Sequence, residues 1–219
     1  VSPSTCDVIR NLSGIWQILF PSKMTKFLDL PQNFDAPGRD FYRRDLESLA
    51  EAVRKAGGQP LEGARLAASI RLFNENRAAI ESLYDLRAAA PHLVPTWELY
   101  LVVRAGALLP VDRHTAMLKD YERAARERAA RKEDRIRVVA IGSFCEQPPL
   151  GLLRTLERAG CYLVDDDLNL GARTIRGAIE PGEDPLGAMV EAYLKKATWS
   201  SSRWDQGKPR GVELSRMVR

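Results

Sequence analysis

One loop carries the residues best suited to chemistry, and these are Gly142, Ser143, Cys145 and Glu146. The loop follows a predicted strand and precedes a predicted helix, which is the edge at which α/β sheets bind ligands. A thiol near a helix N-terminus is easily ionised, so Cys145 could act as a nucleophile. No histidine accompanies it in the loop, because the chain has only His92 and His114. We therefore expect this loop to line a binding site, and a nucleophilic thiol or simple packing are the alternatives.

A second thiol, Cys6, lies in the small polar turn Ser4-Thr-Cys-Asp7, just before a predicted helix. The backbone N–H groups and the dipole at a helix start favour a thiolate, the form that binds metals and iron–sulfur clusters. The three cysteines of the chain cannot all pair, and no secretory signal indicates disulfides. They show no Cys-x-x-Cys spacing, so spacing alone leaves core packing, nucleophile and metal ligand open.

Three carboxylates, Asp165-Asp166-Asp167, follow another predicted strand at the same expected sheet edge. A Mg²⁺ or ribose site is one interpretation, and a solvated turn or helix cap is the more common one. The Gly-x-Gly-x-x-Gly and Gly-x-x-x-x-Gly-Lys-Ser/Thr nucleotide motifs are both absent from the sequence.

The elements that must position these residues are read from hydrophobic periodicity. Apolar residues at a spacing of three or four predict a helix over residues 7–20 and further helices from Asp40 to about Arg131. A short strand is expected at Lys26–Leu30, and residues 33–38 are rich in turn formers. Thr96 and Asp112 are candidate N-caps within the helical part.

The pattern changes after the helical part. Ile136–Ile141 predicts a buried strand, Leu150–Ala159 a helix ended by Gly160, and Cys161–Val164 the next strand. A strand, loop, helix and strand in this order form the unit of a parallel, three-layer α/β domain. Asp184 is then expected to cap a helix that runs to Lys196, with Pro185 as its first residue.

Composition excludes several classes of protein. Apolar residues make up 45% and charged residues 28% of the 219 residues, which excludes wholesale disorder. The net charge of +4 comes from basic residues interleaved with acidic ones, so we expect no nucleic-acid partner. The apolar runs are far shorter than the ~20 residues that span a bilayer, so we expect no membrane association and a cytoplasmic protein.

Several stretches along the chain resemble one known family, namely Pro3–Leu12, Phe27–Phe34, Val102–Leu108, Val138–Leu150 and Ala159–Asp167. The family is that of the benzoyl-CoA reductases and 2-hydroxyacyl-CoA dehydratases, and the resemblance covers essentially all 219 residues. It is closest to the larger of the two cluster-bearing subunits of the ATP-dependent benzoyl-CoA reductases, the B type. Both ends of the sequence look cut, so we expect an internal fragment of such a subunit.

The resemblance implies a two-domain α/β subunit with Rossmann-like domains. Residues 1–38 would then end the first domain, residues 39–134 would form a mostly helical segment, and residues 135–219 would begin the second, three-layer parallel-sheet domain. It also implies a [4Fe-4S] cluster held by three cysteines. Of these, only Cys6 matches a family position, and the other ligands would lie outside this sequence.

The resemblance further implies a ferredoxin-driven reduction of benzoyl-CoA to a cyclic dienoyl-CoA in anaerobic aromatic degradation. The expected partners are a second cluster-bearing subunit, ATP-hydrolysing activator subunits that alone hold ATP and Mg²⁺, ferredoxin, and the acyl-CoA substrate. Gly142, Ser143, Cys145 and Glu146 would contact that substrate. The alternatives are a 2-hydroxyacyl-CoA dehydratase subunit and a non-catalytic scaffold subunit of such a complex.

Overall fold

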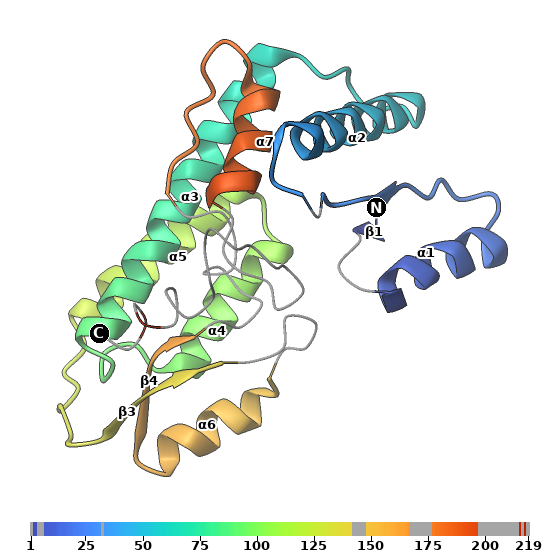
Figure 1. Cartoon of the computed structure of the whole chain (residues 1–219). Coiled ribbons are helices and arrows are strands. Elements are labelled where there is room, and N and C mark those ends of the chain that lie inside the picture. Colours follow the sequence, from blue (N-terminus) through green and yellow to red (C-terminus); the bar gives the residue numbers. More distant parts are fainter. Residues whose placement is uncertain are drawn as a thin grey trace. The chain divides into compact units, whose positions relative to one another are not determined.

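The computed structural model describes residues 2–3, 7–31, 33–141, 148–166 and 177–196, together with 215 and 217 (Figure 1). The described part is an α/β structure that is mostly helical, with parallel strand pairs. It divides into two compact units. The first unit comprises the chain up to Ile70 together with Ile179–Lys196, and the second comprises Arg71 to Ala178.

The first unit begins with a small strand pair around a helix. Strand β1 (Ser2–Pro3) pairs in parallel with β2 (Phe27–Leu28), and α1 (Asp7–Leu19) connects them. The predicted helix at 7–20 is confirmed, and it ends before Pro21, which disfavours helical backbone in the residue that precedes it. The predicted strand at Lys26–Leu30 is present but shorter.

Two further helices complete the first unit, α2 (Ala36–Lys55) and α7 (Pro185–Lys196), along with the start of α3. Their core consists of buried and partly buried apolar side chains: Tyr42, Val190, Leu194, Leu30, Phe34, Leu46 and Tyr193. The helix predicted from Asp40 starts earlier, because Asp35 accepts a hydrogen bond from the Gly38 N–H at 3.0 Å and caps it. Asp184 caps α7 as predicted, accepting from the Gly187 N–H at 3.0 Å.

The second unit contains the rest of α3 (Gly63–Ala89), α4 (Thr96–Arg104), a short 3₁₀ turn η1 (Ala105–Ala107) and α5 (Val111–Arg126). One apolar cluster joins these helices: Ala79, Ile80, Leu83, Leu86, Val94, Leu99, Val103, Leu118 and Ala125.

The predicted N-caps at Thr96 and Asp112 are wrong. Pro95 and Pro110 hold the cap positions, and neither cap makes a side-chain hydrogen bond. The Thr96 N–H instead donates to the Glu157 carboxylate at 2.6 Å, so a residue distant in sequence satisfies the start of α4.

The second unit also holds the predicted strand–helix–strand unit. Strands β3 (Ile136–Ala140) and β4 (Cys161–Asp166) pair in parallel, and α6 (Leu150–Arg158) lies between them in sequence. Gly160, with φ of +91°, ends α6 as predicted. The prediction that the first strand is buried is wrong, because Ile136 is 70% exposed and the later residues of β3 are only partly buried. No helix in the described ranges is long and apolar enough to span a membrane.

Candidate functional site

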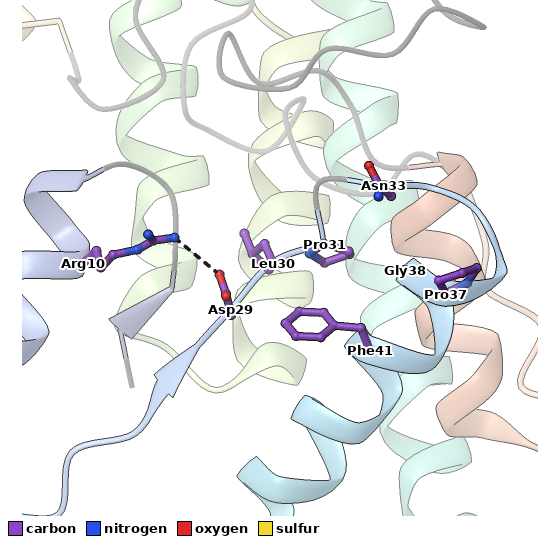
Figure 2. Close-up of a pocket in the computed structure, with 8 residues that line it drawn as sticks. All are labelled: Arg10, Asp29, Leu30, Pro31, Asn33, Pro37, Gly38 and Phe41. Atoms are coloured by element: carbon purple, nitrogen blue, oxygen red, sulfur yellow. Dashed lines mark ion pairs between the residues drawn. The ribbon is translucent and has the colours of Figure 1, made fainter.

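A pocket of about 300 Å³ lies within the first unit, where α1, the segment after β2 and the first turns of α2 meet (Figure 2). Its lining residues are Arg10, Asp29, Leu30, Pro31, Asn33, Pro37, Gly38 and Phe41. Sequence reasoning did not single out any of them as site residues. The signal that could have found them was the stretch Phe27–Phe34, whose polar residues interrupt an apolar run and which carries part of the family resemblance.

The wall that follows β2 is held to α2 by one carboxylate. Asp45 of α2 accepts a hydrogen bond from the backbone N–H of Asp29 at 2.7 Å. Its other oxygen lies 3.2 Å from the Lys26 ammonium, which also donates to Ser48 at 3.0 Å. The Lys26 and Asp45 side chains are only 21% and 17% exposed, so this ion pair is partly shielded from solvent. Asp45 therefore determines where Asp29 and the pocket residues beside it lie.

The opposite wall depends on the absence of a side chain at Gly38. A Cβ atom at this position would lie 1.9 Å from the backbone oxygen of Asn33. The first turn of α2 can therefore approach the segment after β2 only with glycine here.

The polar groups of the pocket are only loosely paired. The Arg10 guanidinium lies 3.9 Å from the Asp29 carboxylate, too far for a hydrogen bond, and 6.0 Å from the centre of the Phe27 ring. The Arg10 side chain makes no hydrogen bond to a described residue and is 59% exposed. Figure 2 shows Arg10 pointing toward Asp29 and the Phe41 ring pointing from α2 into the same space. The pocket thus combines a hydrogen-bond donor with an apolar surface.

The site residues predicted from sequence, Cys6, Gly142, Ser143, Cys145 and Glu146, lie outside the described residues. Their flanks have the predicted elements, since α1 begins directly after Cys6 and the loop lies between the end of β3 and the start of α6. The roles of these five residues stay predictions.

The carboxylates at the end of β4 have a structural partner. Arg87 of α3 and Asp166 are 1% and 2% exposed, and Arg87 Nη2 lies 2.8 Å from Asp166 Oδ2. The same nitrogen lies 3.7 Å from Asp165. Burial lowers the pKa of Arg87, but the attraction of Asp166, Tyr84 and Asp165 outweighs it and the pKa is raised overall. The Asp166 carboxylate therefore has a buried partner within the fold, while Asp167 lies outside the described residues.

His114 is also a buried residue whose ring is hydrogen-bonded within the fold. The ring nitrogens lie 2.9 Å from the Asn76 side-chain amide and 3.0 Å from the Val102 carbonyl, and the side chain is buried. Gly106 packs directly on the ring, where a Cβ would lie 2.5 Å from a ring carbon. The stretch Val102–Leu108, which carries part of the family resemblance, thus holds His114 in place.

The described residues alone do not form an iron–sulfur site. Within them no three His, Cys, Asp or Glu side chains group as metal ligands. The one cysteine that the structure describes, Cys161, is a partly buried free thiol at the start of β4. A cluster ligated by Cys6 would need its other ligands from elsewhere in the protein.

The whole chain matches one family profile and is similar to one subunit of a known reductase. The family profile described as "2-hydroxyglutaryl-CoA dehydratase, D-component" matches residues 1–219. The chain is 41% identical over 219 residues to the C-type subunit of the benzoyl-CoA reductase of Thauera aromatica, covering 99% of the chain and 57% of that relative. Because this relative is of the C type, the prediction of a B-type subunit is wrong.

Two dehydratase subunits are more distant relatives. Identity to lactoyl-CoA dehydratase subunit beta of Anaerotignum propionicum is 27% over 194 residues, covering 86% of the chain and 50% of the relative. Identity to (R)-2-hydroxyglutaryl-CoA dehydratase subunit beta of Acidaminococcus fermentans is 24% over 201 residues, covering 90% of the chain and 52% of that relative. The chain spans between half and three fifths of the length of these curated relatives.

Proposed function

The chain belongs to the 2-hydroxyglutaryl-CoA dehydratase D-component family, and from this premise we propose that it is part of a C-type subunit of a benzoyl-CoA reductase. The reaction is the addition of two electrons and two protons to the ring of benzoyl-CoA, which yields a cyclic dienoyl-CoA. One observation carries the choice of reductase. Identity to the reductase subunit is 41%, against 27% and 24% to the two dehydratase subunits.

In this proposal Cys6 is one ligand of a [4Fe-4S] cluster. Its position directly before α1 supports the role, because the helix start favours a thiolate. An iron–sulfur cluster supplies single electrons at low potential, which reduction of an aromatic ring requires. The remaining ligands lie outside this sequence.

The loop with Gly142, Ser143, Cys145 and Glu146 is proposed to contact the acyl-CoA. Support comes from the described flanks, because the loop leaves the sheet where the parallel strands β3 and β4 both end. The proposed partners in the cytoplasm are a second cluster-bearing subunit, ATP-hydrolysing activator subunits with Mg²⁺, and ferredoxin.

The second candidate function is the dehydration of a 2-hydroxyacyl-CoA. The family description and two of the three relatives favour it, since both of those relatives are dehydratase subunits.

The test uses the assembled complex with the full-length subunit, given benzoyl-CoA and a 2-hydroxyacyl-CoA in parallel. We expect reduction of benzoyl-CoA, and conversion of the hydroxyacyl-CoA alone would establish the dehydratase instead. Cys6→Ala is expected to lower the iron and sulfide content of the subunit and to abolish reduction. Cys161→Ala is the matched control and is expected to keep both the iron and sulfide content and the reduction of benzoyl-CoA. Full iron content and activity in Cys6→Ala would remove Cys6 from the ligand set.

A further inference from the structure

The pocket in the first unit has a surface suited to a flat apolar group. Phe41, Leu30, Pro31 and Pro37 contribute aromatic, branched and ring side chains to its lining. Phe41 remains 38% exposed, although nearby apolar residues such as Tyr42 are buried. Aromatic rings bind other flat rings through stacked or edge-to-face contacts, which Phe41 is placed to make (Figure 2).

The charges of Arg10 and Asp29 determine which polar group an apolar ligand can carry into the pocket. Arg10 offers guanidinium N–H donors that no hydrogen bond to a described residue occupies. Asp29 lines the same pocket, and its carboxylate is 44% exposed, so its negative charge offsets the attraction of Arg10 for a free carboxylate or phosphate. A neutral carbonyl oxygen can accept a hydrogen bond from Arg10 without facing a second full charge.

The size of the pocket sets a further limit. About 300 Å³ is at the lower end of the range for small-molecule sites. This volume accommodates an aryl ring with its carbonyl group but not a nucleotide as well.

We propose that this pocket binds the aromatic acyl group of a CoA thioester, with the ring against Phe41 and the thioester carbonyl accepting a hydrogen bond from Arg10. The inference rests on the proposed function for the choice of thioester. The CoA nucleotide remains outside the pocket. Asp45 and Gly38 shape the site by holding its two walls, without touching the ligand.

The experiment measures equilibrium binding by calorimetry on the assembled complex, without ATP or reductant so that no turnover occurs. The probes are benzoyl-CoA, acetyl-CoA and CoA. Phe41→Leu removes the ring and keeps an apolar side chain, and Phe73→Leu is its control, because Phe73 is an exposed phenylalanine of α3 outside the pocket. Arg10→Gln is compared with Arg71→Gln, which is exposed and also outside the pocket.

We expect Phe41→Leu to raise the Kd for benzoyl-CoA about three- to tenfold, with the Kd for acetyl-CoA unchanged. Arg10→Gln should weaken both thioesters by a similar factor and leave CoA unaffected. Both controls should match wild type, and iron content should be equal in all four variants. The iron content separates loss of binding from an effect on the cluster proposed for Cys6, which precedes Arg10 by four residues in the sequence.

Two results would overturn the proposal in different ways. Wild-type binding of benzoyl-CoA that Phe41→Leu and Arg10→Gln leave unchanged would remove the acyl group from this pocket and leave the reductase function standing. A wild-type complex that binds no benzoyl-CoA would overturn both the pocket assignment and the proposed function.

Discussion

Arg87 shows how one residue decides the role of a conspicuous sequence feature. The run of three aspartates after β4 is compatible with a cation site, yet the buried guanidinium of Arg87 lies 2.8 Å from Asp166 and also faces Asp165. A charge this deeply buried is tolerated only with a partner of opposite sign. Asp165, Asp166 and Arg87 therefore stabilise the end of β4 together.

Replacing Arg87 should destabilise the second unit strongly. Arg87→Met keeps much of the side-chain volume but removes the cation from buried Asp166, at an expected cost of about 3–5 kcal/mol in the free energy of unfolding. Arg123→Ala, which breaks the exposed pair with Asp120, should cost less than about 1 kcal/mol. Urea unfolding of the purified subunit measures both. Recovery of stability in Arg87→Met combined with Asp166→Asn would confirm the mechanism, and equal losses for Arg87→Met and Arg123→Ala would contradict it.

Tyr42 makes the stability of the first unit depend on pH in the alkaline range. Burial, aided by Tyr193 and Asp45, raises the pKa of Tyr42 from 10.0 to about 12. Because the folded state favours the neutral phenol, this contribution to stability is complete below pH 10 and is lost as pH rises from 10 to about 12. Its size is at most about 3 kcal/mol.

Tyr42→Phe should therefore reduce the loss of stability between pH 8 and pH 11, because phenylalanine does not ionise. The measurement is urea unfolding at both pH values, monitored through the circular dichroism signal of the helices. Tyr84→Phe is a control, since Tyr84 belongs to the second unit. An unchanged pH dependence in Tyr42→Phe would show that Tyr42 does not resist ionisation in the folded state.

At the scale of elements, the connection between β2 and α2 builds the pocket. The Asp35 cap fixes the start of α2, Gly38 allows the close approach to Asn33, and Asp45 holds both the Asp29 backbone and Lys26. The two contacts of Asp45 join residues that are 16 and 19 positions apart in the sequence and are partly shielded from water, so they position the pocket wall firmly.

Asp45→Ala should loosen this wall. It leaves the Asp29 N–H and the Lys26 ammonium without their shared acceptor, at an expected cost of about 1–3 kcal/mol in stability. Glu51→Ala, on the same helix in an exposed pair with Arg54, should leave stability close to that of the wild type. Thermal unfolding measures the difference, and hydrogen exchange at residues 26–31 locates it. Equal exchange at residues 26–31 in both variants would show that Asp45 does not anchor the segment.

At the scale of the whole molecule, the two units have separate apolar cores. The core of the first unit includes Leu194, and that of the second includes Leu83, with no residue in common. Each core is built largely by helices that belong to one unit. Each unit should therefore be able to open locally while the other stays folded.

Matched leucine truncations test this separation. Leu83→Ala should cost about 2–5 kcal/mol and speed amide exchange in α4 and α5, and leave α2 and α7 near wild type. Leu194→Ala should speed amide exchange in α2 and α7 and leave α4 and α5 near wild type. Hydrogen exchange read by mass spectrometry on the full-length subunit resolves these helices. Faster exchange in all four helices for either variant would show that the units unfold together.

The sequence alone determined most of the elements, since helices and strands follow from local periodicity and local signals. The spacing of apolar residues predicted α1 and α6, Gly160 ended α6, and Asp184 capped α7. These features depend on residues within one or two turns of each other, so the physics that produces them is visible in a short stretch of chain. The family resemblance was likewise readable from stretches of sequence.

The tertiary structure decided which residues meet. Arg10 reaches Asp29, Asp166 pairs with Arg87 and Glu157 caps α4 only after distant segments pack, and no spacing in the sequence indicates these partners. The prediction that β3 is buried was also wrong, because the burial of a strand depends on what covers it and not on its own composition. The pocket belongs to this class: its lining comes from three elements, and their approach is a property of the packed chain.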